Sequence, residues 1–517
     1  MPRHFNTAGP CDPDIHYMLP PLERLPSLVD LVDQRTYFVV HAPRQTGKTT
    51  AMMAFAKQLT TAGKYSAILM SAEVGAPFSY DAGKAELAIL SAWRLATKVR
   101  LPETLRPSNW PPEAETGARI QTALQEWAIA SPRPLVVLID EIDALQDEAL
   151  LSMLRQLRSG FPDRPSGFPQ SIGLIGLRDV RDYKVASGGS EDLNTSSPFN
   201  IKVESLVIRD FSETEIATLY AQHTHATGQA FTAEALALAY QCTMGQPWLV
   251  NALARQCVEV IVVDRSIAID SQHIHIAKET LIRRKDTHLD SLAKRLRETR
   301  VRAILEPMMA GQDLNESSDE DRDFLVDLGL LRRENNGGLA VANPIYREIL
   351  VRVLAQGPQD SLPSISPTWL TATEELDLEA LRDAFMAFWL QHGEPLLKSA
   401  LYHEIAPHLV LMAYLHRVVN GGGTLEREYA IGRDRMDLCL RYGTVTLGIE
   451  IKVQRDDGRN QLTRGLAQLD GYLARLGLDS GWLVIFDRRE AVSPIETRLR
   501  SEPHQTNSGR SIEVIFA

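Results

Sequence analysis

The chain has 517 residues, which is too long for one ordinary hydrophobic core and predicts about three domains. Hydrophobic residues make up 44 % and charged residues 23 %, the balance of a globular protein, and no run of about 18 apolar residues argues for a membrane span. The formal net charge of −11 means that any contact with nucleic acid must depend on local basic surfaces rather than on the overall field.

The N-terminal stretch MPRHFNTAGPCDPDIHY lacks the apolar core of a secretory signal. The four cysteines are scattered along the chain and form no metal-binding spacing. We therefore expect a soluble protein of the reducing cytoplasm that does not contact a membrane.

A phosphate-binding loop is predicted between Tyr37 and Thr50, where an apolar strand runs into a turn that ends in Gly-Lys-Thr. In such a loop the backbone N–H groups face the phosphates, Lys48 reaches the β and γ phosphates, and the Thr49 hydroxyl ligates Mg²⁺. Ala42 stands where the usual pattern has glycine, so the first turn must use φ values that a side chain tolerates. ATP contacts are predicted for Ala42, Pro43, Arg44, Gln45, Thr46, Gly47, Lys48, Thr49 and Thr50.

A second motif supports the first, because residues 134–143 read PLVVLIDEID, a buried strand that ends in adjacent acids. Asp140 is expected to hold Mg²⁺ through water, and Glu141 to polarise the attacking water as the catalytic group of ATP hydrolysis. Short apolar strands alternate with helical stretches here, which predicts a parallel sheet covered by helices. The predicted strands are Tyr37–Val40, Ser66–Ser71, Leu135–Asp140, Ser171–Leu177 and Phe199–Val203.

Helical periodicity dominates from Asp210 to Arg284 and predicts a helical lid. It begins at a Ser212 cap with Glu215 three residues on, and it contains the turn Met244-Gly245-Gln246-Pro247-Trp248. Together with the loop and the acidic strand, these segments resemble prokaryotic AAA-like ATPases of the STAND-type branch over roughly the first 350 residues.

This resemblance implies that Arg178, at the end of the fourth strand, contacts the nucleotide and senses its γ-phosphate. Arg155 and Arg158, on the helix after the acidic strand, are candidates for an arginine finger toward a neighbouring subunit. Solvated helix charges are the alternative for both.

Residues 301–354 read as a helix, a second helix that continues to Glu334, a glycine turn, a short strand and a third helix. That order predicts a winged helix. In this ATPase group it commonly packs on the lid and relays nucleotide state, while direct DNA reading is the alternative. Proline, glycine and serine then predict a linker at residues 355–367.

Two predicted strands near the C-terminus contain residues for a second reaction site. In residues 435–440 the alternation of side chains predicts that Asp437 points to the face opposite Met436 and Leu438, which are predicted to be buried. In residues 445–453 the same alternation places Glu450 and Lys452 together on the face opposite the apolar residues. Two carboxylates and an ammonium make a divalent-metal site, and a solvated polar face is the alternative.

The arrangement GRDRMDLCL…GIEIKV, followed by a helix at residues 459–477, resembles the PD-(D/E)XK nuclease superfamily. The resemblance implies that Asp437 and Glu450 bind Mg²⁺ or Mn²⁺, that Lys452 orients water or stabilises the phosphate, and that Gln468 joins the catalytic group. Glu404 and Glu428 are rival candidates for an additional acid. The helical histidines His403, His408 and His416 are interpreted as surface or core residues and not as zinc ligands.

The predicted fold class is α/β: a P-loop NTPase parallel sheet with a helical lid and a winged helix, followed by an α/β PD-(D/E)XK nuclease-like domain. The predicted divisions are 1–209 (ATPase), 210–300 (lid), 301–354 (winged helix), 355–367 (linker) and 368–517 (nuclease-like). The predicted function is an ATP-binding and ATP-hydrolysing switch that controls a metal-dependent endo- or exodeoxyribonuclease. Its expected partners are DNA, further copies of the chain and a regulatory protein.

Two other functions remain open at this stage. In the first, the chain is a nucleotide-switch scaffold whose C-terminal domain binds nucleic acid or a partner without cleaving it. In the second, it is a DNA translocase that uses the nuclease as an accessory, although the sequence shows no helicase motif set.

Overall fold

A computed structural model of the chain describes residues 3–108, 110–177, 202–284, 295–296, 298–309, 318–334, 337–361, 367–399, 406–419, 423–428, 437–456, 460–489 and 493–517. The chain divides into two compact units, one made of Met1–Arg284 with Asp323–Ile345 and the other of Lys285–Arg322 with Tyr346–Ala517. Across the described residues, every helix is too short or too polar to span a bilayer.

The first unit is built on a five-stranded parallel sheet with the strand order β4-β5-β6-β3-β7. Its strands are β3 (Tyr37–His41), β4 (Ser66–Ser71), β5 (Leu135–Asp140), β6 (Ser171–Gly176) and β7 (Lys202–Val207). The strand that leads into the phosphate loop therefore lies between β6 and β7. The predicted parallel sheet is confirmed, but the fifth strand continues to Val207, four residues beyond its predicted end.

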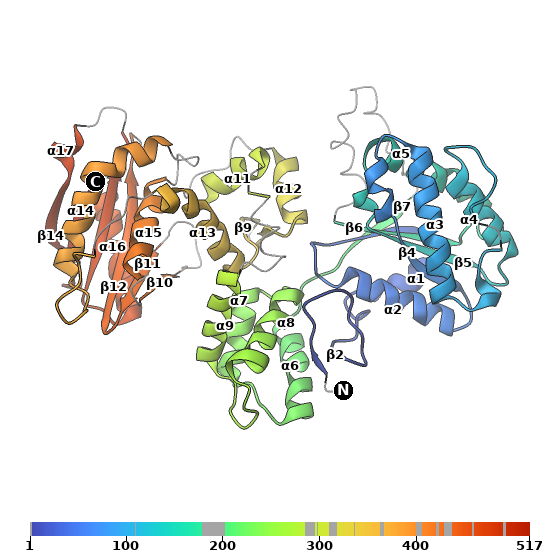
Figure 1. Cartoon of the computed structure of the whole chain (residues 1–517), viewed down its shortest axis with the longest axis horizontal. Helices are drawn as coiled ribbons and strands as arrows, with labels where there is room; N and C mark the ends of the chain where they lie inside the picture. Colours follow the sequence, from blue (N-terminus) through green and yellow to red (C-terminus); the bar gives the residue numbers. More distant parts are fainter. Residues whose placement is uncertain are drawn as a thin grey trace. The chain divides into compact units, whose positions relative to one another are not determined.

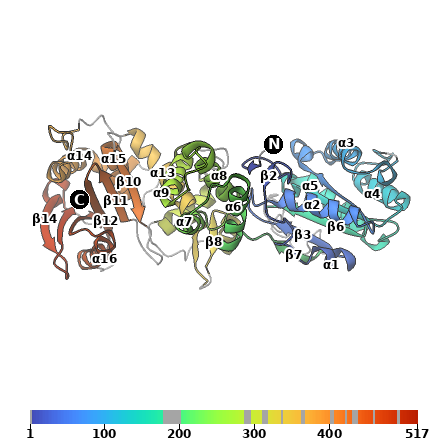
Figure 2. The same ribbon diagram turned by 90° about the horizontal axis from the view of Figure 1, so that it is seen from below.

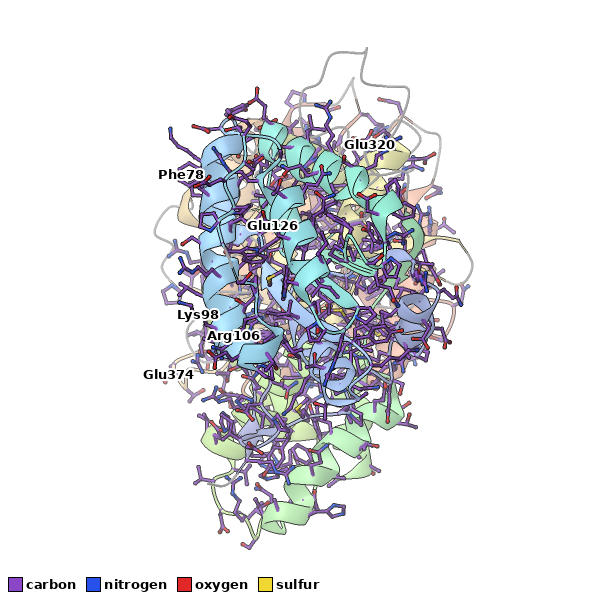
Figure 3. The ribbon with its side chains drawn as sticks, turned by 90° about the vertical axis from the view of Figure 1, so that its right-hand side faces the viewer. Phe78, Lys98, Arg106, Glu126, Glu320 and Glu374 are labelled. Carbon is purple, nitrogen blue, oxygen red and sulfur yellow. The ribbon has the colours of Figure 1, made fainter. Side chains whose placement is uncertain are left out.

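Helices cover both faces of this sheet. One face packs against α3 (Ala82–Arg100), α4 (Arg119–Ala130) and α5 (Asp147–Ser159), with a buried cluster of Trp93, Trp110 and Trp127 between them. In Figure 3, Lys98 marks the end of α3 and Glu126 lies on the neighbouring α4. The other face packs against α1 (Leu28–Asp33) and α2 (Lys48–Thr61). Short 3₁₀ helices lie at Glu73–Phe78, Glu103–Leu105, Ile142–Ala144 and Phe161–Asp163.

The predicted helical lid follows β7. It consists of α6 (Glu213–Thr227), α7 (Ala233–Thr243), α8 (Pro247–Gln256), a π-helical turn (Cys257–Ile261) and α9 (Ser271–Arg284). The Ser212–Glu215 capping box is confirmed at the start of α6. Gly245 has φ +82°, and an added Cβ would lie 1.9 Å from the Phe211 carbonyl oxygen, so only glycine fits this turn.

Two short N-terminal strands, β1 (His4–Phe5) and β2 (His16–Tyr17), pair in parallel beside the lid. The rings of Phe5 and Tyr17 pack against Tyr220 and His223 of α6, with centroid distances of 4.9–5.8 Å within this group. Tyr17 is therefore a packing residue of the lid.

After the lid come α11 (Thr299–Met309), α12 (Asp319–Asp327), β8 (Leu331–Arg333), β9 (Leu339–Val341) and α13 (Pro344–Ser361). These elements follow the order predicted for a winged helix, whose assembly into one domain stays a prediction, and two of the predicted boundaries were wrong. The second helix ends at Asp327 instead of Glu334, because Gly329 takes φ +75° and the chain then enters β8. The first part of the predicted linker is helical, since α13 continues to Ser361.

The C-terminal part of the second unit holds a six-stranded mixed sheet, with the order β10-β11-β12-β13-β15-β14. Its strands are β10 (Thr424–Glu428), β11 (Asp437–Tyr442), β12 (Val445–Gln454), β13 (Ser480–Asp487), β14 (Arg500–Gln505) and β15 (Ser511–Phe516). Its helices are α14 (Leu378–Ser399), α15 (Ala406–Val419), α16 (Gln461–Leu476) and the short α17 (Ile495–Arg498). Helices α14 and α15 lie on one side of the strands and α16 on the other (Figures 1 and 2).

Candidate functional site

The phosphate loop connects β3 to α2. Gly47 takes φ +95° and caps α2, and Gln45 takes φ +61°. Ala42 has no positive φ and its side chain is buried, so the methyl group at this position is tolerated, as predicted. The loop therefore presents the N-terminus of a 14-residue helix, where backbone N–H groups attract anions.

Lys48 is folded back onto its own loop. Its Nζ donates to the carbonyl oxygens of Ala42 at 2.7 Å and Pro43 at 2.8 Å. Burial lowers the pKa of the Lys48 ammonium to about 8, although Asp143, Glu141 and Asp140 act in the opposite direction. The ammonium is held where phosphate oxygens would replace the two carbonyls as its partners.

The predicted Mg²⁺ ligands lie together. Thr49 Oγ1 donates to Asp140 Oδ2 at 2.7 Å, and Asp140 is 5 % exposed at the end of β5. A hydroxyl and a carboxylate are oxygen ligands of the kind that Mg²⁺ prefers, so these two residues fit the ion.

Glu141 begins the 3₁₀ turn after β5 in a left-handed conformation, with φ +54°. Burial raises the pKa of its carboxyl, and the neighbouring charges of Asp143 and Asp140 raise it further. A carboxylate with a raised pKa accepts a proton more readily, as activation of water requires.

Sequence reasoning missed Asp143. Burial raises the pKa of its carboxyl, and among charged groups it has the largest effect on Lys48. Its Oδ1 is buried and has no hydrogen-bond partner among the described residues. Asp143 is the third acid of the segment PLVVLIDEID, so the sequence already contained a signal for a further acid close to Lys48.

Arg24 also belongs to this site and had no local sequence signal. Its guanidinium donates to the Thr46 carbonyl at 3.0 Å and to the Arg209 carbonyl at 2.9 Å, and it lies 4.8 Å from the centre of the Phe211 ring. Burial lowers the pKa of Arg24 to about 10 and raises that of the adjacent Asp210 to about 6. One side chain thus joins the phosphate loop to the base of the lid.

A further contact reaches the loop from the segment before β8. An added Cβ at Gly329 would lie 2.6 Å from the Cβ of Pro43, so these two residues touch. Thr50 accepts a hydrogen bond from the Cys11 N–H at 3.0 Å. The phosphate loop is therefore contacted by three separate segments of the first unit.

Three of the predicted nucleotide-linked arginines remain untested. Arg178 lies outside the described residues. Arg155 and Arg158 are exposed on α5, which agrees equally with a role at a neighbouring subunit and with solvated charges.

In the C-terminal sheet, Glu450 is fully buried and Lys452 is 8 % exposed. The Lys452 ammonium lies 2.5 Å from Glu450 Oε1, in an ion pair between alternate residues of β12. The predicted placement of these two side chains on one face is confirmed. Burial of a carboxylate is costly without a cation beside it, and Lys452 supplies that cation.

Strand register brings the acidic positions together. Residue 437 pairs with residue 428 across β10 and β11. Leu438 pairs with Ile449, so the antiparallel register sets residue 437 beside Glu450 in the next step. Positions 428, 437 and 450 therefore form one row across three strands, which we call the acid row. The side chains of Glu428 and Asp437, and all of Glu404, lie outside the described part.

Helix α16 packs on the face that carries Glu450. An added Cβ on Gly448 would meet Leu473 at 2.7 Å and Tyr472 at 3.3 Å, so glycine allows the helix to approach β12. Gln468 lies one turn before Tyr472 and is half-buried, and its Oε1 has no hydrogen-bond partner among the described residues. Gln468 thus has a buried acceptor on the helix that packs against β12.

His408 was interpreted as a surface or core residue, and it is buried on α15. Burial, together with the charges of Lys452 and Arg455, lowers the pKa of its imidazole to about 3. His408 is therefore neutral at physiological pH. Among the side chains that the structure describes, no group of three or more His, Cys, Asp or Glu residues is placed to hold a metal.

Neither a protein-family model nor a curated protein sequence matches the chain. The Walker-type ATPase of Pyrococcus abyssi matches with a TM-score of 0.47 and 12 % identity, over 67 % of this chain and 99 % of that one. The RuvB Holliday junction branch migration motor of Thermotoga maritima matches with a TM-score of 0.34 and 15 % identity, over 63 % and 92 %. Cdc6p of Pyrobaculum aerophilum matches with a TM-score of 0.34 and 11 % identity, over 65 % and 93 %.

All three scores are below 0.5, and the assignment of the fold depends on the sheet order and loop geometry given above. The first unit has the α/β fold of P-loop ATPases.

Replacing Lys48 with alanine removes the cation that faces the phosphates, so we expect ATP affinity to fall at least about 100-fold, a loss of roughly 2.7 kcal/mol. Calorimetric titration with ATP and Mg²⁺ measures this change. Lys57→Ala is the control, because Lys57 is exposed on the same helix α2. Equal affinities for the two variants would contradict the site.

The low pKa of His408 predicts an acid-sensitive second unit. As pH falls below 6.5 the unfolded histidine is protonated first, so stability present above pH 6.5 is progressively lost toward pH 3. Between pH 7.5 and 5, His408→Gln should lose about 2 kcal/mol less unfolding free energy than the unmodified chain in urea titrations. His416→Gln on the same helix is the control, and identical pH profiles for all three proteins would contradict the assignment.

Proposed function

We propose that the chain is an ATP-binding and ATP-hydrolysing switch that controls a metal-dependent nuclease in its C-terminal domain, with DNA as the substrate. The observation that carries the proposal is the acid row beside a buried Glu450–Lys452 ion pair. The proposed division into ATPase, lid, winged-helix and nuclease-like domains follows the predicted boundaries, except that α13 continues into the predicted linker as far as Ser361.

ATP hydrolysis is assigned to the end of β5. Lys48 and the loop N–H groups would hold the phosphates, and Thr49 and Asp140, which are hydrogen-bonded to each other, would hold Mg²⁺. Glu141 then accepts a proton from the attacking water, and Arg178 is proposed to contact the γ-phosphate. The raised pKa of Glu141 supports its role as the base.

The nuclease chemistry is assigned to the acid row. Asp437 and Glu450 would hold Mg²⁺ or Mn²⁺, an ion that polarises the phosphodiester and lowers the pKa of bound water. Lys452 lies next to Glu450, so it can orient water or balance negative charge as the phosphate is attacked. Gln468, from α16, would position water or substrate through its unsatisfied Oε1.

Nucleotide control is assigned to the contacts around the phosphate loop. Arg24 bonds to the loop and to the chain leading into the lid, and Gly329 touches Pro43. A phosphate that displaces the Lys48 contacts would change this loop and with it the position of the lid. Assembly with further copies of the chain, or with a regulatory protein, is the proposed means by which the lid controls the nuclease. Control of the nuclease by nucleotide would protect the host's own DNA from cleavage.

A scaffold function is the second candidate, and one observation favours it. Glu450 is fully buried and already neutralised by Lys452, as in an ion pair that serves only stability. In that case the C-terminal domain would bind nucleic acid or a partner without cutting, and replacement of Asp437 would leave function intact.

The deciding experiment incubates the full chain with linear, circular and single-stranded DNA in Mg²⁺ or Mn²⁺, with and without ATP. We expect cleavage that falls at least about 100-fold in Glu450→Gln, because the isosteric amide cannot bind the ion as a carboxylate does. We also expect ATP to change the cleavage rate only while Lys48 is intact. Cleavage that is absent from every reaction, with ATP hydrolysis intact, would support the scaffold function.

A further inference from the structure

A cavity of about 310 Å³ opens at the carboxyl ends of β12 and β13 in the C-terminal domain. Gln454 and Asp487, which pair in register at the ends of these parallel strands, line it together with Asn460, the N-cap of α16. This volume is at the small end of the range for ligand pockets, about 300–1,000 Å³. The cavity therefore suits one small polar group and not a large apolar ligand.

The lining is basic. Arg489, Arg498 and Arg500 line the cavity together with one acid, Asp487. Arg489 is paired with Asp487 and Arg500 with Glu502, which leaves a surplus of one positive charge. This balance is the reverse of that of the whole chain, whose net charge is −11. Guanidinium groups recognise phosphate oxygens with two parallel hydrogen bonds, and they are the preferred side chains for that purpose.

The arginines are held in place by the fold. Arg489 donates to both oxygens of Asp487, at 2.9 and 2.5 Å. Arg500 bonds to Glu502 at 2.7 Å and lies 4.0 Å from the centre of the Phe516 ring. Arg498 donates to the Ser493 carbonyl at 2.8 Å. Positioned guanidiniums lose less conformational entropy when they bind an anion than freely rotating ones do.

The cavity continues the face that carries the proposed metal site. Glu450, Lys452 and Gln454 alternate on β12 and so share one face of the sheet. At about 3.3 Å per residue, Gln454 lies about 7 Å along the strand from Lys452 and about 13 Å from Glu450. Successive phosphates of a nucleic-acid strand are spaced by about 3.4 Å of axial rise, so the separation corresponds to a few nucleotides.

We infer that this arginine-lined cavity binds a phosphate of the DNA strand that lies a few nucleotides from the linkage at the acid row. The inference rests on the proposed nuclease function and adds to it a place where the substrate strand is held. The phosphate can be an internal one or a terminal one, since both present the same oxygens to the arginines.

The test measures binding without cleavage. Full-length protein in EDTA is titrated against an internally labelled single-stranded DNA oligonucleotide by fluorescence anisotropy, from 50 to 200 mM NaCl. Arg498→Gln/Arg500→Gln should raise Kd about tenfold or more and reduce the slope of log Kd against log salt by about 0.7, because the contact with one phosphate is lost. Arg441→Gln is the control, since Arg441 is exposed and pairs with Thr446 near the opposite end of β12.

Three versions of the oligonucleotide locate the phosphate, carrying a 5′-phosphate, a 3′-phosphate or hydroxyls at both ends. If the double variant loses the same affinity for all three oligonucleotides, the cavity binds an internal phosphate. If it loses affinity only for the oligonucleotide with one phosphorylated end, the cavity binds that terminal phosphate. The inference is overturned if the Kd of the double variant is within twofold of that of the unmodified chain for all three oligonucleotides. It is also overturned if the unmodified chain does not bind the oligonucleotides.

Two further measurements keep the outcome interpretable. Arg489→Gln, which leaves Asp487 without its ion pair, is a second variant that should also weaken binding if the double variant does not fold, as judged from its thermal melting. DNA binding that depends on the arginines in a chain that never cuts DNA would retain the cavity and refute the nuclease. DNA cleavage that requires Glu450 but does not depend on the arginines would support the nuclease and refute the role of the cavity.

Discussion

The second unit depends on one electrostatic constraint: a fully buried carboxylate at Glu450 needs a cation beside it. Lys452 provides that cation from the same face of the same strand, because side chains alternate along β12. The pair lies on the face that also carries the apolar side chains of Leu483 and Ile485, and register places positions 437 and 428 in the same row as Glu450. Helix α16 covers this face and Gly448 allows its close approach, so the Glu450–Lys452 pair is enclosed between the helix and the sheet.

The first unit uses the same principle with the charges reversed. Lys48 is partly buried at the start of α2. The three acids at and after the end of β5 oppose the effect of burial on its pKa. The loop carbonyls hold the ammonium, and Arg24 connects the loop to the base of the lid. Binding of a phosphate therefore changes a charge balance that reaches beyond the loop. This is the physical basis for proposing a switch.

Local pattern was enough to predict the elements that carry the chemistry. Apolar runs predicted the strand before Gly47 and the strand that ends at Asp140. Alternation predicted the strand around Glu450 and the shared face of its polar residues. Boundaries that depend on one backbone angle were harder to predict. Gly329 ends α12 early through its positive φ, and α13 continues through Gly357 and Pro358 where the composition predicted a linker.

The residues that sequence reasoning missed are those whose roles arise only from tertiary contacts. Arg24 lies in an unremarkable segment, and it connects the phosphate loop to Arg209 because β7, which precedes Arg209, pairs with β3. His408 is neutral because the fold buries it near Lys452 and Arg455, which are distant in sequence. Asp143 was visible as a third acid, but its effect on Lys48 depends on the turn after β5.

The central claim is that the acid row holds a divalent cation, and direct counting of bound Mn²⁺ by electron paramagnetic resonance tests it. In the absence of nucleotide, the full chain should bind Mn²⁺ at a site that is lost in Glu450→Gln and in Asp437→Asn, and is retained in Lys48→Ala. Retention of that site in both acid-row variants would contradict the account and leave the buried Glu450–Lys452 pair as a structural feature.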